Sequence, residues 1–338
     1  MDKRGLAVVA LAVATAIGHG CSKGPAPARS EAEAFRAARA AYRAAETPEE
    51  KAKVGEDYLA EFPGGAHSAA FAEVVIESPG RNATERRRAY DIVHRALERA
   101  ADPAVRFQLG LQLFGLSYEV GQPLNLEKLA DELAAKRGLT FSENLDVAKA
   151  AAKQSLWTLT EKFAYLALAQ AAPGAYRAEH GNGKADEKQI AKAVQMRSAF
   201  ALGYQAWAEF NLGREDEAED LFKRADRHLT FNYLGIPDEP VRRLWARAEI
   251  ARGNWARAIA LLEPSAVLGG DPVALADLRR AWAGRAGSAK GFDAYLWQAR
   301  RRLAHKVDDF RLADYSGAEH ALSEDRGKVI LLAFWFPT

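Results

Sequence analysis

Apolar residues recur at three- and four-residue spacing along most of this chain, and this periodicity constrains the fold more than any other feature of the sequence. Leu109, Leu113 and Leu116 form one such stripe. Alanine is abundant and β-branched residues are sparse, so intrinsic preferences also favour helix. Short segments with proline and glycine, such as 62–65 and 172–174, interrupt the pattern. The sequence therefore predicts a mainly α domain over residues 31–304.

Two aspartate–proline pairs, Asp102–Pro103 and Asp271–Pro272, mark expected helix starts. The aspartate can accept hydrogen bonds from the free backbone N–H groups of the first turn, and proline fits the first helical position because it has no N–H to leave unpaired. Residues 103–190 are predicted to be helical, although they match no repeat.

Two segments in the later part of this region share one layout. The shared positions are Ala206, Gly213 and Ala218 in one segment and Ala246, Gly253 and Ala258 in the other. This layout resembles the tetratricopeptide repeat, in which a glycine turn joins two antiparallel helices and small residues let them approach closely. The segments are 40 residues apart (258 minus 218), against about 34 in a standard repeat. Residues 229–237 are expected to hold the extra length.

The resemblance to tetratricopeptide repeats implies an α-solenoid, in which stacked helix pairs form a concave groove. Such grooves bind peptides or proteins, so we expect protein or peptide partners for residues 31–304. The tryptophans of this region are predicted to fill space between helices rather than to stack on ligands. They are Trp157, Trp207, Trp245, Trp255, Trp282 and Trp297.

Residues 305–338 follow a different pattern. The segment 329–336 is an almost continuous apolar run, which is typical of a strand buried on both faces of a sheet. A series of spaced residues precedes it. The series consists of Asp309, Phe310, Leu312, Asp314, Gly317, Gly327 and Lys328.

This series resembles the opening of a thioredoxin-like redoxin domain of the TlpA-like thiol–disulfide reductase group, whose members read D-F-x-L-x-D-x-x-G, then G-K-V and F-W, and then C-x-x-C. The resemblance implies an incomplete thioredoxin-like α/β domain over 305–338, holding the N-terminal strands only. By the family spacing, Trp335, Pro337 and Thr338 would form the turn before the active site, and the first cysteine would directly follow Thr338. No residue of the catalytic pair lies within the sequence, because the chain has one cysteine, Cys21.

We interpret the position after Thr338 as selenocysteine, whose UGA codon also reads as a stop. A selenol is ionised at neutral pH, and the anion is the attacking species in thiol–disulfide exchange. The full product would then be a thiol–disulfide reductase or peroxidase of the bacterial envelope, to which the helical repeats present partner proteins. The alternative is a non-catalytic binding lipoprotein in which residues 305–338 are a relic. A frameshift, a pseudogene or a deliberate boundary would also explain the pattern.

Residues 1–20 have the layout of an export signal. A short basic segment at 2–4 precedes an apolar segment at 5–17. The apolar segment is shorter than the roughly 20 residues that span a bilayer, so it is predicted to be a cleaved signal peptide.

The only cysteine follows this signal directly. Glycine followed by Cys21 resembles a bacterial lipobox, although Gly18 stands where an aliphatic residue is usual. We therefore expect lipidation of Cys21, a flexible tether over residues 21–30 and a membrane-anchored protein facing the periplasm. The alternative is ordinary signal-peptidase cleavage, which would give a free periplasmic protein.

The charge balance argues against a nucleic-acid partner. The chain has 47 Lys and Arg against 45 Asp and Glu. Basic clusters at 86–88 and 300–302 have acidic or apolar neighbours, so they are predicted to be solvated helix faces. The seven histidines include no pair spaced for a metal ion, and neither a metal site nor a cofactor is predicted.

Overall fold

The computed structural model describes residues 29–77, 82–181, 186–232, 235–304 and 308–328. Within these ranges the chain forms fifteen α-helices and one two-stranded sheet, which confirms the prediction of a mainly α fold. The lipidation predicted at Cys21 and the turn predicted at Trp335, Pro337 and Thr338 lie outside the described residues. Among the helices that the structure describes, none combines the length and the hydropathy that crossing a bilayer requires.

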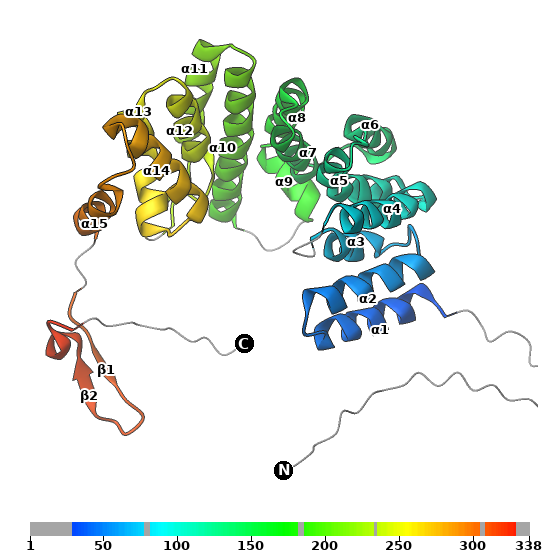
Figure 1. The fold of residues 1–338 in the computed structure, drawn as a ribbon, viewed down its shortest axis with the longest axis horizontal. Coiled ribbons are helices and arrows are strands. Elements are labelled where there is room, and N and C mark those ends of the chain that lie inside the picture. Colours follow the sequence, from blue (N-terminus) through cyan, green and yellow to red (C-terminus); the bar gives the residue numbers. More distant parts are fainter. Residues whose placement is uncertain (1–28, 78–81, 182–185, 233–234, 305–307, 329–338) are drawn as a thin grey trace, which may run out of the picture. The chain divides into compact units, whose positions relative to one another are not determined.

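The chain divides into two compact units, residues 1–113 and 114–338. The first unit contains α1 (Glu31–Ala44), α2 (Pro48–Glu61), α3 (Ser68–Glu77), α4 (Ala83–Arg99) and the first part of α5 (Pro103–Glu119), which are drawn in blue to cyan in Figure 1. The prediction that a helix starts at Asp102–Pro103 is confirmed, because Asp102 Oδ1 accepts a hydrogen bond from the Ala104 backbone N at 2.9 Å.

Capping boxes fix the starts of three helices in the first unit. The N-cap side chains are Ser30, Thr47 and Asn82, and in each case the glutamate three positions later bonds back to the cap. α2 packs against α1, α3 and α4. It approaches α3 closely at Gly55, where a Cβ atom would lie 2.9 Å from the Phe71 carbonyl oxygen.

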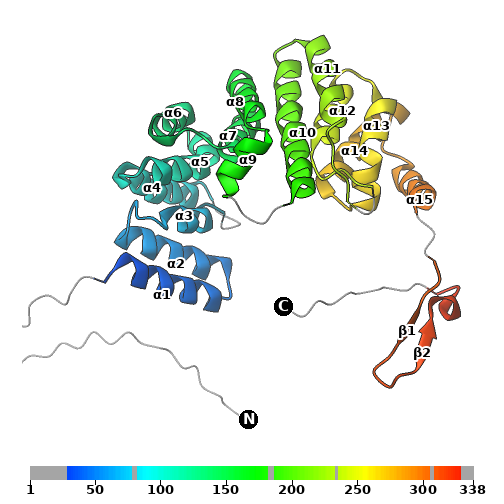
Figure 2. The same cartoon turned by 180° about the vertical axis from the view of Figure 1, so that it is seen from behind.

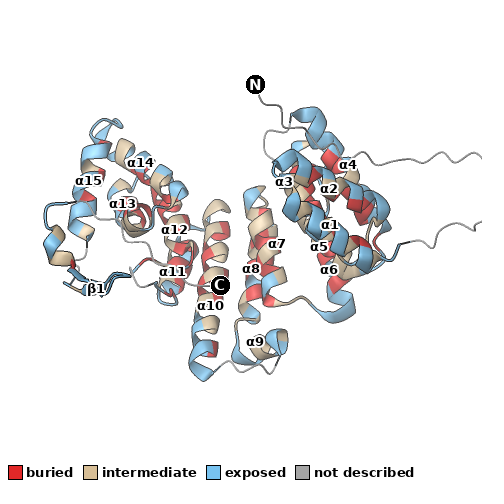
Figure 3. Cartoon of the chain, turned by 90° about the horizontal axis from the view of Figure 1, so that it is seen from below, coloured by how far each residue is buried: buried red, intermediate tan, exposed pale blue. Residues whose placement is uncertain are grey.

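The second unit contains the rest of the helices. They are α6 (Leu126–Arg137), α7 (Phe141–Lys153), α8 (Trp157–Ala169), α9 (Pro173–His180), α10 (Glu187–Asn211), α11 (Glu215–Asp226), α12 (Val241–Ala251), α13 (Trp255–Glu263), α14 (Pro272–Ala286) and α15 (Phe292–Leu303). α10 packs against α7, α8, α11 and α12, and these helices lie side by side in both views of the fold (Figures 1 and 2). Buried residues, red in Figure 3, gather along them.

The two predicted repeat segments form two similar helical hairpins, α10–α11 and α12–α13. Gly213 and Gly253 adopt φ values of +83° and +78°, a left-handed conformation that glycine accepts without strain. Ala206 and Ala246, the small residues at the helix crossings, are fully buried. The extra length lies between α11 and α12, as predicted from residues 229–237.

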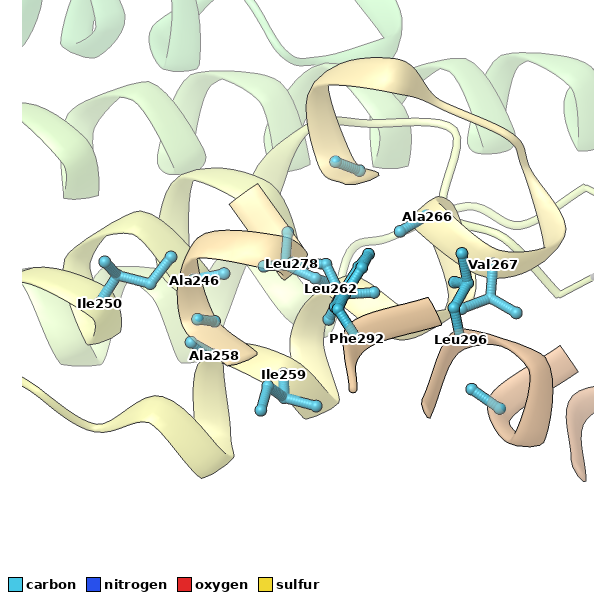
Figure 4. Packing of buried hydrophobic residues seen from close by; sticks show 13 residues of the cluster. Ala246, Ile250, Ala258, Ile259, Leu262, Ala266, Val267, Leu278, Phe292 and Leu296 are labelled. Atoms are coloured by element: carbon cyan, nitrogen blue, oxygen red, sulfur yellow. The ribbon is translucent and has the colours of Figure 1, made fainter. Parts of the chain in front are cut away.

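The end of the helical region has its own apolar core. Leu262, Leu278 and Phe292 come from α13, α14 and α15 and are almost completely buried, and Figure 4 shows them converging. A π-helical turn, Pro264–Leu268, joins α13 to the loop before α14. Asp271 caps α14 as predicted, because its Oδ1 accepts hydrogen bonds from the backbone N atoms of Val273 and Ala274.

A β-hairpin follows the helices. β1 (Arg311–Ala313) pairs antiparallel with β2 (Glu319–Ala321), with Leu312 opposite His320, and a 3₁₀ turn, Leu322–Asp325, comes next. The buried strand predicted at 329–336 lies outside the described residues.

Candidate functional site

A groove of about 920 Å³ lies between α2 and α4 in the first unit and is called here the α2/α4 groove. α2 and the loop after it contribute Lys53, Glu56, Asp57, Leu59, Ala60 and Pro63. α4 contributes Arg87, Arg88, Asp91, Ile92, Arg95 and Arg99. Its volume lies within the range of roughly 300–1,000 Å³ that is usual for ligand sites.

The three acidic side chains of this groove all form ion pairs. Arg88 Nη2 lies 2.7 Å from Glu56 Oε2 and thereby links α4 to α2. Lys53 Nζ lies 2.5 Å from Asp57 Oδ1, and Arg87 Nε lies 3.2 Å from Asp91 Oδ1. Each carboxylate of the lining therefore already has a cation of its own.

Two arginines of the groove differ from the others. Arg95 and Arg99 are exposed, and among the residues that the structure describes neither makes an ion pair or a side-chain hydrogen bond. They are four positions apart on α4, so their side chains leave the same face of the helix. The groove thus presents two neighbouring guanidinium groups whose donors are directed to solvent, and such groups bind carboxylates or phosphates well.

Sequence reasoning missed this groove. The cluster 86–88 is exposed, as predicted for a solvated helix face, but the prediction did not include a groove, and the structure places Arg87 and Arg88 in its lining. The spacing of Arg88, Arg95 and Arg99 along one helix was a usable signal, because residues seven and eleven positions apart lie close to one face.

A second and smaller groove of about 510 Å³ lies in the same unit. Its walls include Phe35, Tyr42 and Phe71 together with Arg39 and Glu73. Phe71 also stacks on Tyr58, with ring centroids 4.3 Å apart. This groove is therefore a more aromatic surface formed by α1, α2 and α3.

The residues predicted from the redoxin resemblance gather in the C-terminal hairpin. Asp309 accepts hydrogen bonds from the backbone N and the Oγ of Ser323, at 2.8 and 2.7 Å, so it joins the start of the hairpin to the turn that follows it. Phe310 contributes its carbonyl oxygen, which accepts from Leu322 N at 3.0 Å. The hydrogen bonds from Ser323 lower the pKa of Asp309.

Asp314 organises the tip of the hairpin. Its Oδ1 accepts from Ser316 Oγ at 2.6 Å, Ser316 N at 2.8 Å and Ala318 N at 3.0 Å. Gly317 follows with φ of +87°, which explains why the pattern has glycine there. The hydrogen bond from Ser316, and then that from His320, lower the pKa of Asp314 to about 2.

The remaining residues of this series lie at the edges of the hairpin. Leu312 is more than half exposed in β1. Gly327 has φ of +86°, and Lys328 Nζ bonds to Asp325 Oδ1 at 2.7 Å. Asp309 therefore orders the base of the hairpin, and Asp314 and Gly317 order its tip. These residues carry no reactive group besides their carboxylates.

No cluster of three or more metal-ligating side chains occurs among the described residues. In comparisons with known proteins, no family model matches the chain and no curated protein matches it significantly.

Proposed function

We propose that this protein is a helical-repeat binding protein, and that its first unit receives a peptide or a partner protein in the α2/α4 groove. The observation that carries the proposal is the pair of exposed and unpaired arginines, Arg95 and Arg99, in a groove of about 920 Å³. The repeated hairpins of the second unit support the same class of function, because helical-repeat proteins commonly act as binding scaffolds.

The groove is well suited to binding because its walls are already ordered. The ion pair between Arg88 and Glu56 joins α2 to α4, and the capping boxes at Thr47 and Asn82 fix the starts of both helices. A wall that is ordered before binding loses less conformational entropy when a partner arrives.

Site-specific photo-crosslinking tests this function. A photoreactive amino acid at Ala60, an exposed position in the groove, is expected to crosslink a partner in the cells that make the protein. The matched control is Ala40, an exposed alanine of α1 that does not line the groove. Equal crosslinking from both positions, or none from Ala60, would contradict the proposed site.

Export and membrane anchoring belong to the same proposal. The basic and apolar segments before Cys21 support a lipoprotein signal. Replacing Cys21 by serine is expected to move the protein from the membrane fraction to the periplasmic fraction. If the wild-type protein is already in the periplasmic fraction, the anchor is wrong and ordinary signal cleavage explains the segment.

A second candidate function is thiol–disulfide exchange or peroxide reduction by a redoxin domain that begins with the hairpin. The observation that favours it is the joint role of Asp309, Asp314 and Gly317 in ordering that hairpin. The nucleotide sequence that follows codon 338 tests it. A UGA codon followed in frame by a cysteine codon and a redoxin-like continuation would support a selenocysteine enzyme. A different stop codon without such a continuation would leave the binding function alone.

A further inference from the structure

We propose that the α2/α4 groove selects an acidic peptide segment, and that Arg95 and Arg99 pair with two of its carboxylates. This inference rests on the proposed binding function and specifies the chemistry of the partner. Five basic and three acidic side chains line the groove. Since each acidic side chain has its own cation, the surplus positive charge resides on these two arginines.

The basic side chains are spaced to follow an extended chain. Arg88 and Arg99 are eleven positions apart on α4, which at about 1.5 Å per residue corresponds to roughly 16 Å along the helix. A peptide strand of about five residues covers the same length at roughly 3.3 Å per residue. Arg95 lies between them, one turn from Arg99, so acidic residues close together in an extended peptide can meet both free guanidinium groups.

The floor of the groove indicates which kind of residue separates the acidic residues of the bound peptide. Leu59 is almost fully buried, and Ile92 and Pro63 are half-buried. These side chains offer an apolar surface between the charged walls, so we expect apolar residues to alternate with the acidic ones in the bound segment.

The same lining disfavours nucleic acid. Three of the five cations in the lining are already paired with Glu56, Asp57 and Asp91, so two remain to neutralise a run of phosphates placed along α4. A peptide with two acidic residues needs no more than these two cations. The charge pattern favours a protein partner with an acidic stretch over a nucleic-acid backbone.

The test measures binding of the full-length protein to two fluorescein-labelled peptides by fluorescence anisotropy. One peptide has aspartate and glutamate interspersed with leucine, and the other has asparagine and glutamine in place of the acids. The acidic peptide is expected to bind more tightly by a factor of about ten or more, and its affinity should fall as salt is raised.

Variants then place this binding in the groove. Arg95→Gln and Arg99→Gln are each expected to lower the affinity for the acidic peptide about tenfold, and the double variant is expected to lower it about a hundredfold. Arg43→Gln is the matched control, since Arg43 is exposed and, like Arg99, lies in the last turn of its helix. Circular dichroism of each variant checks that the helices are intact.

The outcomes separate this inference from the proposed function. Equal binding of both peptides, lost when Ala60 is replaced by tryptophan to fill the groove, would retain a binding groove and overturn its acidic specificity. Binding of the acidic peptide that is unchanged in the double variant would also overturn the inference. If a single-stranded oligonucleotide binds more tightly than the peptide, and its binding depends on the same arginines, the inference of an acidic protein partner is wrong and the groove binds nucleic acid. Absence of binding by either peptide, together with no crosslinking from Ala60, would remove the proposed function itself.

Discussion

The hairpins α10–α11 and α12–α13 have the same backbone but stabilise it with different side chains. In both, the residue after the turn glycine donates its backbone N–H to the carbonyl of a glutamate at the end of the preceding helix: Arg214 to Glu209 at 3.0 Å, and Asn254 to Glu249 at 2.8 Å. The glutamates are both buried, at 7% and 0% exposure. The repeat therefore retains a glycine turn and a buried carboxylate.

The difference lies in what neutralises that carboxylate. At the first turn Arg214 alone bridges Glu209 and, at 2.7 Å, Glu161 of α8. At the second turn Asn254 Nδ2 donates to Glu249 at 2.8 Å, while Arg252 and Arg257 lie 3.4 and 3.5 Å away. In the first hairpin the residue directly after the turn glycine is the cation, whereas in the second hairpin that position is Asn254 and the cations lie at positions 252 and 257.

The arginines of the second turn also form ion pairs with α11, which belongs to the first hairpin. Arg257 Nη2 lies 2.8 Å from Glu219 of α11, and Arg252 Nε lies 2.8 Å from Glu215 of the same helix. A buried charge must be compensated, but several partners can share the task. At the first turn, therefore, one arginine both neutralises the buried carboxylate and pairs with another helix, whereas at the second turn a network of two arginines and an asparagine does so.

Removing the buried carboxylates should lower the stability of the protein more than any other change at these two turns. Glu249→Ala removes a fully buried carboxylate and leaves the Asn254 amide without its acceptor, although Arg252 and Arg257 keep their pairs with α11. We expect the free energy of unfolding to fall by about 3 kcal/mol. Glu209→Ala should cost less, about 1.5 kcal/mol, because this carboxylate is slightly exposed and its partner Arg214 keeps its bond to Glu161. Urea denaturation followed by circular dichroism measures both. A larger loss for Glu209→Ala would reverse our ranking of the two turns.

Removing one cation from each turn should separate the single bridge from the network. Arg214→Ala leaves the buried Glu209 without its cation, whereas after Arg257→Ala the carboxylate of Glu249 retains Asn254 and Arg252. We expect the first variant to lose at least about twice as much stability as the second in the same urea experiment. Equal losses would show that the network provides no redundancy.

The two glycines should give equal and smaller effects. Neither Gly213 nor Gly253 has an atom within 4 Å of a Cβ placed on it, so alanine at either position meets left-handed strain without a steric clash. Gly213→Ala and Gly253→Ala should each cost about 1 kcal/mol. Unequal costs would mean that the backbones of the two turns differ more than their φ values indicate.

These hairpins also show which features the sequence could predict. The glycine turns, the buried alanines and the Asp271 cap all follow from local rules of spacing and backbone conformation, and the structure has each of them. The prediction for Trp297 was wrong, because this side chain is 61% exposed rather than packed between helices. Helical periodicity indicates an apolar face but does not say whether another helix covers it.

The ion pair that joins α2 to α4 in the candidate site could not be predicted in this way, unlike the two i,i+4 pairs within these helices. Arg88 and Glu56 are separated by 32 residues and meet only because α2 packs on α4. The same packing leaves Arg95 and Arg99 without a carboxylate, whereas the arginines of the glycine turns have one. The sequence contains these arginines, but their pairing depends on tertiary contacts that no local pattern encodes.

The smallest expected effect concerns the pH dependence of the network. Burial acts to raise the pKa of Glu219, but the hydrogen bond and charge of Arg257 outweigh it, and the pKa lies below the ordinary 4.5. A lowered pKa adds stability above pH 4.5 that is lost as the pH falls through the folded-state value.

The stability advantage of the wild type over Arg257→Ala should therefore be constant near neutral pH and shrink as the pH falls below about 4.5. Urea midpoints measured across this range provide the test, with Gly253→Ala as the control, since that variant changes the same turn without changing a charge. If the two variants respond to acid alike, the charge of Arg257 contributes nothing specific to Glu219, and the second turn depends on Asn254 and packing instead of on a network of arginines.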